Sequence, residues 1–279
     1  MSHPWEANVI GGVLPPRFVL CDSENHITNG EFEVNGDDWD GGGVSQYADP
    51  LTPFGDFVGR LDPTDTMYQT ISPSLGALGG MSFALTLFAR GSGVESFTIS
   101  ATSPAESHTV YLRDLDSSEY RPRAGVVTFS AGQTDTEFTV SCTATAALHV
   151  DRIRCHRVMR DITGLPLPSV DQYDFERQLQ ARTIRADLTI TDYVLGWRFT
   201  AELKYDLLTA MQEIRRTQIS EAGIIIFWPH TDANFVMSCL WDDTKYRRRY
   251  FHNRYLGHVG TIALIGADLL SAKPIEVIS

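Results

Sequence analysis

Apolar and polar residues alternate along much of the first 160 residues, which is the pattern of half-buried β-strands. Residues 81–90 show the alternation most clearly, with Met81, Phe83, Leu85, Leu87 and Ala89 on one face. Turn residues separate such segments about every 8–12 positions, which is typical of a β-sandwich. Strands are therefore expected at 31–35, 57–61, 68–71, 81–90, 97–101, 110–112, 126–129, 138–142 and 148–153.

In the last hundred residues apolar and polar positions again alternate as in strands, except in one segment where the apolar positions have helical spacing. Residues 209–219 have apolar positions at helical spacing, with Thr209 as the expected N-cap and Gln212 completing a capping box. The sequence predicts an α+β domain with one main helix packed on an antiparallel sheet. Its strands are expected at 182–190, 194–203, 224–228, 235–241, 246–251 and 259–265.

The two patterns meet at a segment rich in proline and glycine, Gly164-Leu165-Pro166-Leu167-Pro168-Ser169. Such a composition is typical of a linker. The expected organisation is an extended N-terminal arm (1–24), an all-β jelly-roll sandwich (25–162), a linker (163–181) and an α+β anchoring and oligomerisation domain (182–279).

Charge differs between the two halves. The chain has a net charge of −12, of which residues 1–165 account for −11, with 21 acidic and 10 basic side chains. An acidic module repels nucleic acid and anionic membranes. No signal peptide and no apolar run long enough to span a bilayer is found in the sequence. The four cysteines form no CxxC pair, and we expect them to be reduced rather than to form a Cys142–Cys155 disulfide.

The opening segment Asn29-Gly30-Glu31-Phe32-Glu33, followed by an acidic glycine-rich turn and Trp39, resembles galactose-binding-like jelly-roll modules. Those modules include carbohydrate-binding modules, and they end in an aliphatic-Asp-aliphatic strand. Val150-Asp151-Arg152-Ile153 stands where that strand is expected. The resemblance covers about residues 25–160.

The resemblance implies two kinds of site. Aromatic rings in that family stack on sugars, so Trp39 and Tyr47 are candidate sugar platforms; core packing is the alternative for Trp39. Acidic loops in the family hold structural calcium, which suits hard oxygen ligands. The alternative for the acidic residues is a solvated loop. The candidate calcium ligands are Asp37, Asp38, Asp40 and Asp49.

The second half resembles structural proteins of tailed-phage virions. The segments that carry this resemblance are Gly196-Trp197-Arg198-Phe199 and Ile226-Phe227-Trp228-Pro229. It implies a place in a tail, baseplate or head appendage, with copies of itself and other virion proteins as partners. The chain would then be made in the host cytoplasm and end in the virion.

A run of arginine and aromatic residues lies near the end of the chain. Arg and Tyr are enriched in protein interfaces, so we expect a subunit contact and a homo-oligomer. A solvated face and a nucleic-acid contact are the alternatives; the second is disfavoured by the mixed alternation of the strand. The expected interface residues are Tyr246, Arg247, Arg248, Arg249, Tyr250 and Arg254.

The sequence shows no nucleophile elbow, P-loop or dinucleotide fingerprint. His230, Asp232, His252 and His258 lack the spacing of a metal site, and we interpret them as structural. The expected function is therefore non-enzymatic: a virion component that anchors through its C-terminal domain and displays a sandwich for host-glycan contact. The alternative is a free carbohydrate-binding protein or glycan-active enzyme.

Overall fold

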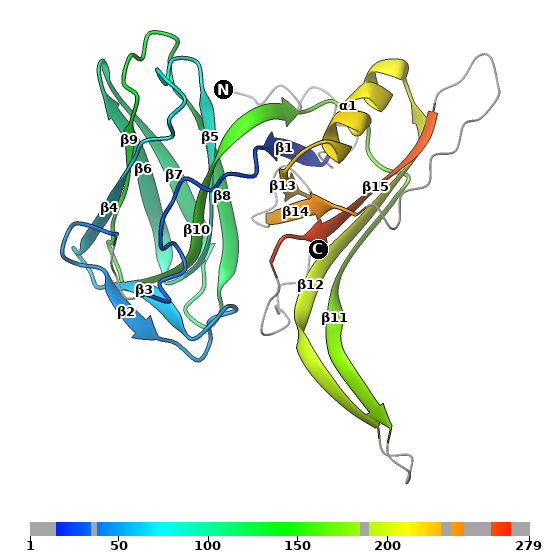
Figure 1. The fold of residues 1–279 in the computed structure, drawn as a ribbon, viewed down its shortest axis with the longest axis horizontal. Coiled ribbons are helices and arrows are strands. Elements are labelled where there is room, and N and C mark those ends of the chain that lie inside the picture. Colours follow the sequence, from blue (N-terminus) through cyan, green and yellow to red (C-terminus); the bar gives the residue numbers. More distant parts are fainter. Residues whose placement is uncertain (1–14, 35–37, 185–189, 230–235, 243–257, 269–279) are drawn as a thin grey trace. The chain divides into compact units, whose positions relative to one another are not determined.

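The computed structural model describes residues 15–34, 38–184, 190–229, 236–242 and 258–268. It divides into two compact units (Figure 1). The sandwich unit is mainly Cys21–Arg160. The α+β unit consists of Met1–Leu20 and most of the chain after Arg160.

The sandwich unit consists of two antiparallel sheets, as the sequence predicts. One sheet has the order β2-β3-β10-β5-β8, and the other has the order β4-β9-β6-β7. The first comprises β2 (Ser45–Ala48), β3 (Phe57–Leu61), β10 (Leu148–Ile162), β5 (Ser82–Arg90) and β8 (Arg121–Thr128). The second comprises β4 (Thr66–Ile71), β9 (Phe138–Thr143), β6 (Gly93–Thr102) and β7 (Ala105–Leu115).

Apolar side chains from both sheets form one core between them. Phe83 of β5 lies at its centre, with its ring centroid 4.6 Å from that of Phe138 and 6.1 Å from that of Phe129. Tilted and edge-on contacts at such distances are favourable for aromatic rings. The alternating face of residues 81–90 expected from the sequence is therefore the face that packs in the core.

The strand expected at 31–35 is wrong, because the described part of this segment is a turn. Asn29 and Phe32 have φ angles of 45° and 54°, which no β-strand allows. The turn lies against β10, where the Ile153 amide donates to the Gly30 carbonyl at 3.0 Å. A Cβ atom at Gly30 would lie 2.0 Å from the Ile153 carbonyl oxygen, so this close approach requires glycine.

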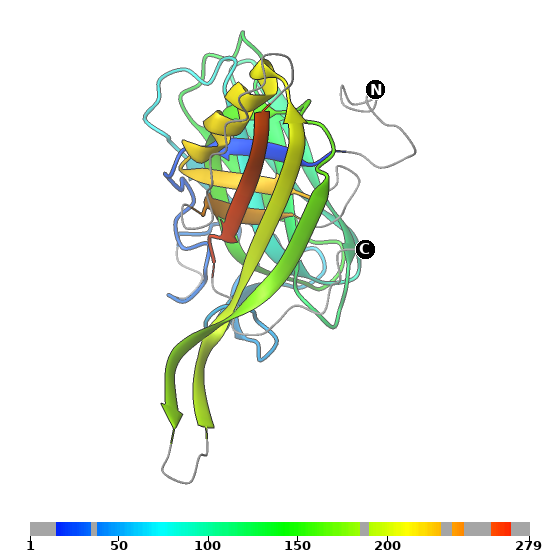
Figure 2. The same ribbon diagram turned by 90° about the vertical axis from the view of Figure 1, so that its right-hand side faces the viewer.

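The α+β unit has one sheet of order β11-β12-β15-β14-β13-β1 and, among the described residues, one helix, α1. Figure 2 shows β11 and β12 as a long hairpin. This confirms the expected fold class. The elements are β1 (Arg17–Cys21), β11 (Val170–Ile184), β12 (Ile190–Leu208), α1 (Ala210–Ser220), β13 (Ile224–Trp228), β14 (Met237–Trp241) and β15 (His258–Gly266).

Two segments expected to lack regular structure contain strands. The arm expected over 1–24 includes β1, whose Phe18 is fully buried with its ring 5.2 Å from that of Phe227. The linker expected over 163–181 includes the first part of β11, where the Tyr173 ring lies 6.0 Å from Phe227. Both segments become strands because the sheet offers backbone partners and an apolar surface.

The start of α1 follows the expected capping box. The Gln212 amide donates to the Thr209 hydroxyl at 3.3 Å, and the Gln212 side chain accepts from the Thr209 amide at 2.9 Å. Arg216 is buried in the next turn, where it forms a double hydrogen bond with Glu213. No helix in the described parts of the chain is long and apolar enough to cross a membrane.

Replacing Thr209 by alanine should remove one of the two hydrogen bonds of this capping box. We expect a loss of about 1 kcal/mol in the free energy of unfolding, measured by urea denaturation. Thr209→Ser keeps the hydroxyl and should retain most of that stability. Equal losses in the two variants would contradict a capping role.

Candidate functional site

The outer face of the sheet β4-β9-β6-β7 carries hydroxyl groups at position after position. Alternation in a strand places every second side chain on the same face. The other positions, such as Phe97 and Val140, lie in the core. We call the outward set the hydroxyl face: Thr66, Tyr68, Thr70, Ser96, Thr98, Ser100, Thr102, Ser107, Thr109, Tyr111, Thr139, Ser141 and Thr143.

Strand register aligns these residues in rows across the sheet. One row begins at Tyr68 of β4 and continues through Ser141, Thr98 and Thr109 on the next three strands. Another row ends at Tyr111 of β7. At about 4.8 Å between strands and 3.4 Å between residues, Tyr68 and Tyr111 are separated by roughly 16 Å. Two aromatic residues therefore border a strip of small hydroxyl side chains.

Some of these hydroxyl groups already bond to each other between strands. The oxygens of Thr66 and Thr143 are 2.9 Å apart, and those of Thr70 and Thr139 are 3.4 Å apart. Each hydroxyl has one proton to donate and two lone pairs. A threonine pair therefore keeps further acceptor capacity for a ligand.

The two tyrosines are the exposed aromatic residues of this face. Tyr68 is 39% exposed and Tyr111 is 57% exposed. The Arg113 guanidinium lies 5.6 Å from the centroid of the Tyr111 ring, a cation–π contact. An exposed tyrosine offers a flat apolar surface with a polar tip, which suits the mixed apolar and hydroxyl faces of a sugar ring.

Trp39, a candidate sugar platform in the sequence, belongs to the core instead. Its side chain is 7% exposed and its ring stacks on Phe32 with centroids 6.0 Å apart. The indole N–H donates to the Asn29 carbonyl at 3.1 Å. The turn at Asn29 and Phe32 directs the Phe32 ring inward, and Trp39 packs against that ring. Of the two roles expected for Trp39, the structure therefore supports core packing.

Tyr47, the other candidate, lies on β2 of the opposite sheet and is 37% exposed. Its ring meets that of His149 edge-on at 5.2 Å, and the Arg60 guanidinium lies 5.2 Å from its centroid. Both neighbours occupy part of the ring surface. A sugar contact at Tyr47 stays a prediction, separate from the hydroxyl face.

Asp49, a candidate calcium ligand, is 3% exposed and is surrounded by hydrogen-bond donors. Burial by itself would raise its pKa. Hydrogen bonds from the Leu51 amide, Tyr120 and Arg90, together with a hydrogen bond between Asp49 and His149, outweigh burial and lower the pKa of Asp49 to about 2. Its oxygens are therefore engaged by protein groups and do not fit the role of a calcium ligand.

The remaining candidate calcium ligands are Asp37, Asp38 and Asp40. Asp40 forms a backbone bridge with Tyr68, with both N···O distances 2.9 Å. Asp37 lies outside the described residues. Within the described ranges, no group of three or more His, Cys, Asp or Glu side chains is arranged to hold a metal ion. Calcium at Asp37, Asp38 and Asp40 therefore stays a prediction.

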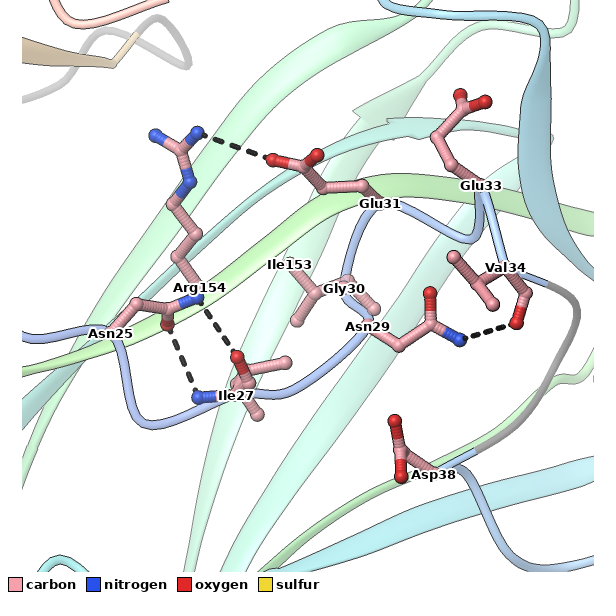
Figure 3. Close-up of a pocket in the computed structure, with 10 residues that line it drawn as sticks. All are labelled: Asn25, Ile27, Asn29, Gly30, Glu31, Glu33, Val34, Asp38, Ile153 and Arg154. Carbon is pink, nitrogen blue, oxygen red and sulfur yellow. Dashed lines mark hydrogen bonds and ion pairs between the residues drawn. The ribbon is translucent and has the colours of Figure 1, made fainter.

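A cavity of about 610 Å³ lies in the sandwich unit beside the turn that precedes Trp39 (Figure 3). Its charged groups are largely engaged: Glu31 pairs with Arg154 at 3.7 Å, and Glu33 accepts from the Asp56 amide at 3.1 Å. Its lining includes no aromatic ring, which makes it a weaker sugar site than the hydroxyl face. The lining residues are Asn25, Ile27, Asn29, Gly30, Glu31, Glu33, Val34, Asp38, Ile153 and Arg154.

The run from Tyr246 to Arg254, expected as a subunit interface, lies outside the described residues. Their role as a subunit interface therefore stays a prediction for Tyr246, Arg247, Arg248, Arg249, Tyr250 and Arg254.

Comparison with known proteins finds similarity in structure only. No family model and no curated protein matches the chain. A family 16 carbohydrate-binding module is 17% identical, with a TM-score of 0.36, and the match covers 47% of this chain and 99% of that module. The CBM22-1 xylan-binding domain from Paenibacillus barcinonensis Xyn10C is 12% identical, with a TM-score of 0.40 and coverage of 50% and 98%.

A phage protein is also among the similar structures. The enzymatically active domain of tailspike protein 4 from bacteriophage CBA120 is 15% identical, with a TM-score of 0.37. The match covers 48% of this chain and 21% of that one. All these scores are low, so the function of this chain has to be argued from its own residues.

Replacing Asp49 by asparagine should show how much its network stabilises the sandwich unit. The pKa of about 2 lies below the ordinary 3.8, so the stabilisation is complete above about pH 4 and is lost as the pH falls toward 2. This difference in pKa between the folded and unfolded states corresponds to a stabilisation of about 2 kcal/mol at neutral pH. Denaturant unfolding at several pH values should show this loss in Asp49→Asn, together with a weaker acid dependence below pH 4.

The matched control is Asp62→Asn, which removes a carboxylate paired with Arg60 on the surface. Exposed ion pairs contribute little, so its stability should stay close to that of the unmodified protein. An Asp49→Asn protein as stable as this control at neutral pH would contradict a stabilising role for the network.

Proposed function

We propose that the sandwich unit binds an uncharged glycan chain across the hydroxyl face. The observation that carries this proposal is the pair of exposed tyrosines, Tyr68 and Tyr111, on a sheet face whose other members are threonines and serines. The rings supply apolar contact, and the hydroxyl groups between them supply donors and acceptors along the chain.

The chemistry of the face favours a neutral ligand. None of its thirteen members is charged, and one guanidinium, that of Arg113, lies over the Tyr111 ring at the edge of the face. The surrounding half of the chain is acidic, so an anionic polysaccharide would be repelled. A row of hydroxyl groups contributes many weak bonds rather than one strong one. Recognition would then depend on several sugar units lying along the strip, with modest affinity for a single sugar.

The binding is proposed to be non-catalytic. Thr102 of this face donates its hydroxyl proton to the Asp135 carboxylate at 2.9 Å. Glycoside hydrolysis commonly uses two carboxyl groups on either side of the scissile bond, and the thirteen members of the face include no carboxyl group. In this proposal the outward tyrosines and hydroxyl groups would hold a glycan without hydrolysing it.

The place of the protein in a phage-like virion is a further proposal, which rests on the sequence resemblance of the second half. In that setting the α+β unit would hold the chain in a particle and the sandwich unit would contact host glycan. Many copies on one particle would strengthen weak binding through avidity. A free glycan-binding protein with the same face is the alternative.

Replacing either tyrosine by alanine should weaken glycan binding. Loss of the apolar contact of one ring is expected to reduce the affinity for the glycan about tenfold. The double variant Tyr68→Ala/Tyr111→Ala should not be retarded by the polysaccharide at all. Affinity electrophoresis in gels that contain soluble neutral polysaccharides measures this. The panel includes xylan and β-1,4-galactan, since similar modules are described as xylan-binding and as a complex with β-1,4-galactotriose.

Tyr68→Phe should keep most of the binding, because stacking needs the ring and not its hydroxyl. Tyr47→Ala on the other sheet separates the two candidate sites: if the glycan lies across the hydroxyl face, this variant should leave retention unchanged. Loss of binding in Tyr47→Ala alone would move the site away from the hydroxyl face. No retention by any neutral polysaccharide would count against the proposal as a whole.

A further inference from the structure

Segment 22–27 of the sandwich unit lies along β10 without forming a strand of its own. The His26 amide donates to the Cys155 carbonyl at 2.9 Å. In return, the Cys155 amide donates to the Asn25 side-chain oxygen at 3.0 Å. The segment is thus attached to β10 by a small number of individual hydrogen bonds, and the loss of one of them weakens the whole attachment.

His156 of β10 adds a side-chain bond to this attachment. Its Nδ1 lies 2.7 Å from the Glu24 carbonyl oxygen. Because a carbonyl oxygen only accepts, Nδ1 carries the proton, and the neutral ring has its lone pair at Nε2. His156 is 3% exposed, and the residue opposite it on β5 is Ala84, which has no polar side chain.

The second ring nitrogen of His156 is buried without a partner. Among the described residues, no group forms a hydrogen bond with Nε2 of His156, and the same is true of Nε2 of His26 and Oδ1 of Asp22. Protonation of His156 would place an N–H group and a positive charge at a buried position with no acceptor. A buried charge without a partner costs free energy, so the fold favours the neutral ring.

The charged and titratable groups around His156 come from segment 22–27 and from β10. Burial is the main reason why the pKa of His156 lies below its ordinary value of 6.5, and Arg154 and His26 act in the same direction. The bond to the Glu24 carbonyl and the Asp22 carboxylate act in the opposite direction but do not outweigh burial. The neutral ring is therefore the form that fits the attached segment.

We propose that His156 is an acid-sensitive latch: its neutral ring holds segment 22–27 on β10, and its protonation releases the segment. Release exposes the ring to water, which solvates the charge. Asn25 and Ile27 of this segment line the cavity beside the turn (Figure 3), so its release opens one side of that cavity. The hydroxyl face lies on the other sheet, and this proposal is independent of glycan binding.

The difference in pKa between the attached and released states sets the pH range of the latch. In the released segment His156 has its ordinary pKa of about 6.5, and on β10 its pKa is lower. The attachment therefore has its full stability above about pH 7 and loses it as the pH falls below about 6.5. The loss of stability from Asp49 begins only near pH 4, so the two effects are separable.

Hydrogen exchange measured by mass spectrometry on the full-length protein tests the latch. Exchange at about pH 7.5 and about pH 5 is compared after correction for the intrinsic pH dependence of amide exchange. Peptides that contain residues 22–27 should lose protection at least about fivefold at the lower pH, because release becomes up to about tenfold easier per pH unit. Peptides from β6 and β9 should keep their protection.

His156→Asn removes the titration and keeps the bond, because an asparagine amide nitrogen replaces Nδ1 as the donor to the Glu24 carbonyl. In this variant the protection of segment 22–27 should be the same at both pH values. His156→Gln is a second variant without a titrating ring, and circular dichroism at neutral pH checks that each variant is folded. The matched control is His108→Asn, which removes a histidine paired with Glu106 on β7 and should keep the loss of protection.

Two results would each overturn the proposal. The first is a protection of segment 22–27 in the unmodified chain that is equal at the two pH values. The second is a loss of protection at the lower pH that is as large in a folded His156 variant as in the unmodified chain, since a group other than His156 would then release the segment.

Discussion

The apolar core between the two sheets of the sandwich unit is the constraint on which its surface depends. Burying Phe97 and Ile99 of β6 forces Ser96, Thr98 and Ser100 outward, because successive side chains of a strand point to opposite faces. The same holds on β4, β7 and β9. Four strands that each satisfy the core thereby align their hydroxyl residues on one surface, and register places a tyrosine at each side of it. The candidate site is thus a consequence of how the core packs.

A second constraint acts on the opposite sheet, where a charge is buried. Asp49 is stable there because Arg90 of β5 and Tyr120, in the segment before β8, donate to it and His149 of β10 is hydrogen-bonded to it. A buried charge needs such partners, since burial without them costs several kcal/mol. The network links four parts of the chain that are distant in sequence, Asp49 and its three partners. It also explains why a carboxylate on an acidic, glycine-rich segment serves stability here rather than metal binding.

Much of the fold follows from local pattern. Residues 81–90 form the expected strand, and Thr209 with Gln212 forms the expected capping box, because strand alternation and helix capping depend on neighbours within a few residues. The pattern failed at 31–35, where alternation predicted a strand and the chain forms a turn. There Phe32 contacts Trp39 and the backbone meets Ile153, contacts that no short window of sequence contains. The sequence did not predict the hydroxyl face for a related reason. The alternation of Phe97 and Ile99 identifies a strand, but it does not show which residues of the three other strands lie beside Thr98.

The sequence by itself determined the two-part organisation, the strand-rich first half, the single capped helix and the acidic character of the sandwich, since each depends on composition or on short-range periodicity. Only the tertiary structure decided that Trp39 is buried, that Asp49 is paired, and that Tyr68 and Tyr111 share one face with eleven hydroxyl residues. It also decided that β11 is the last of the described strands at one end of its sheet. The physical reason is the same in each case: burial and neighbourhood across strands are set by register and packing between segments far apart in the chain, and the periodicity of one segment carries no information about its partner.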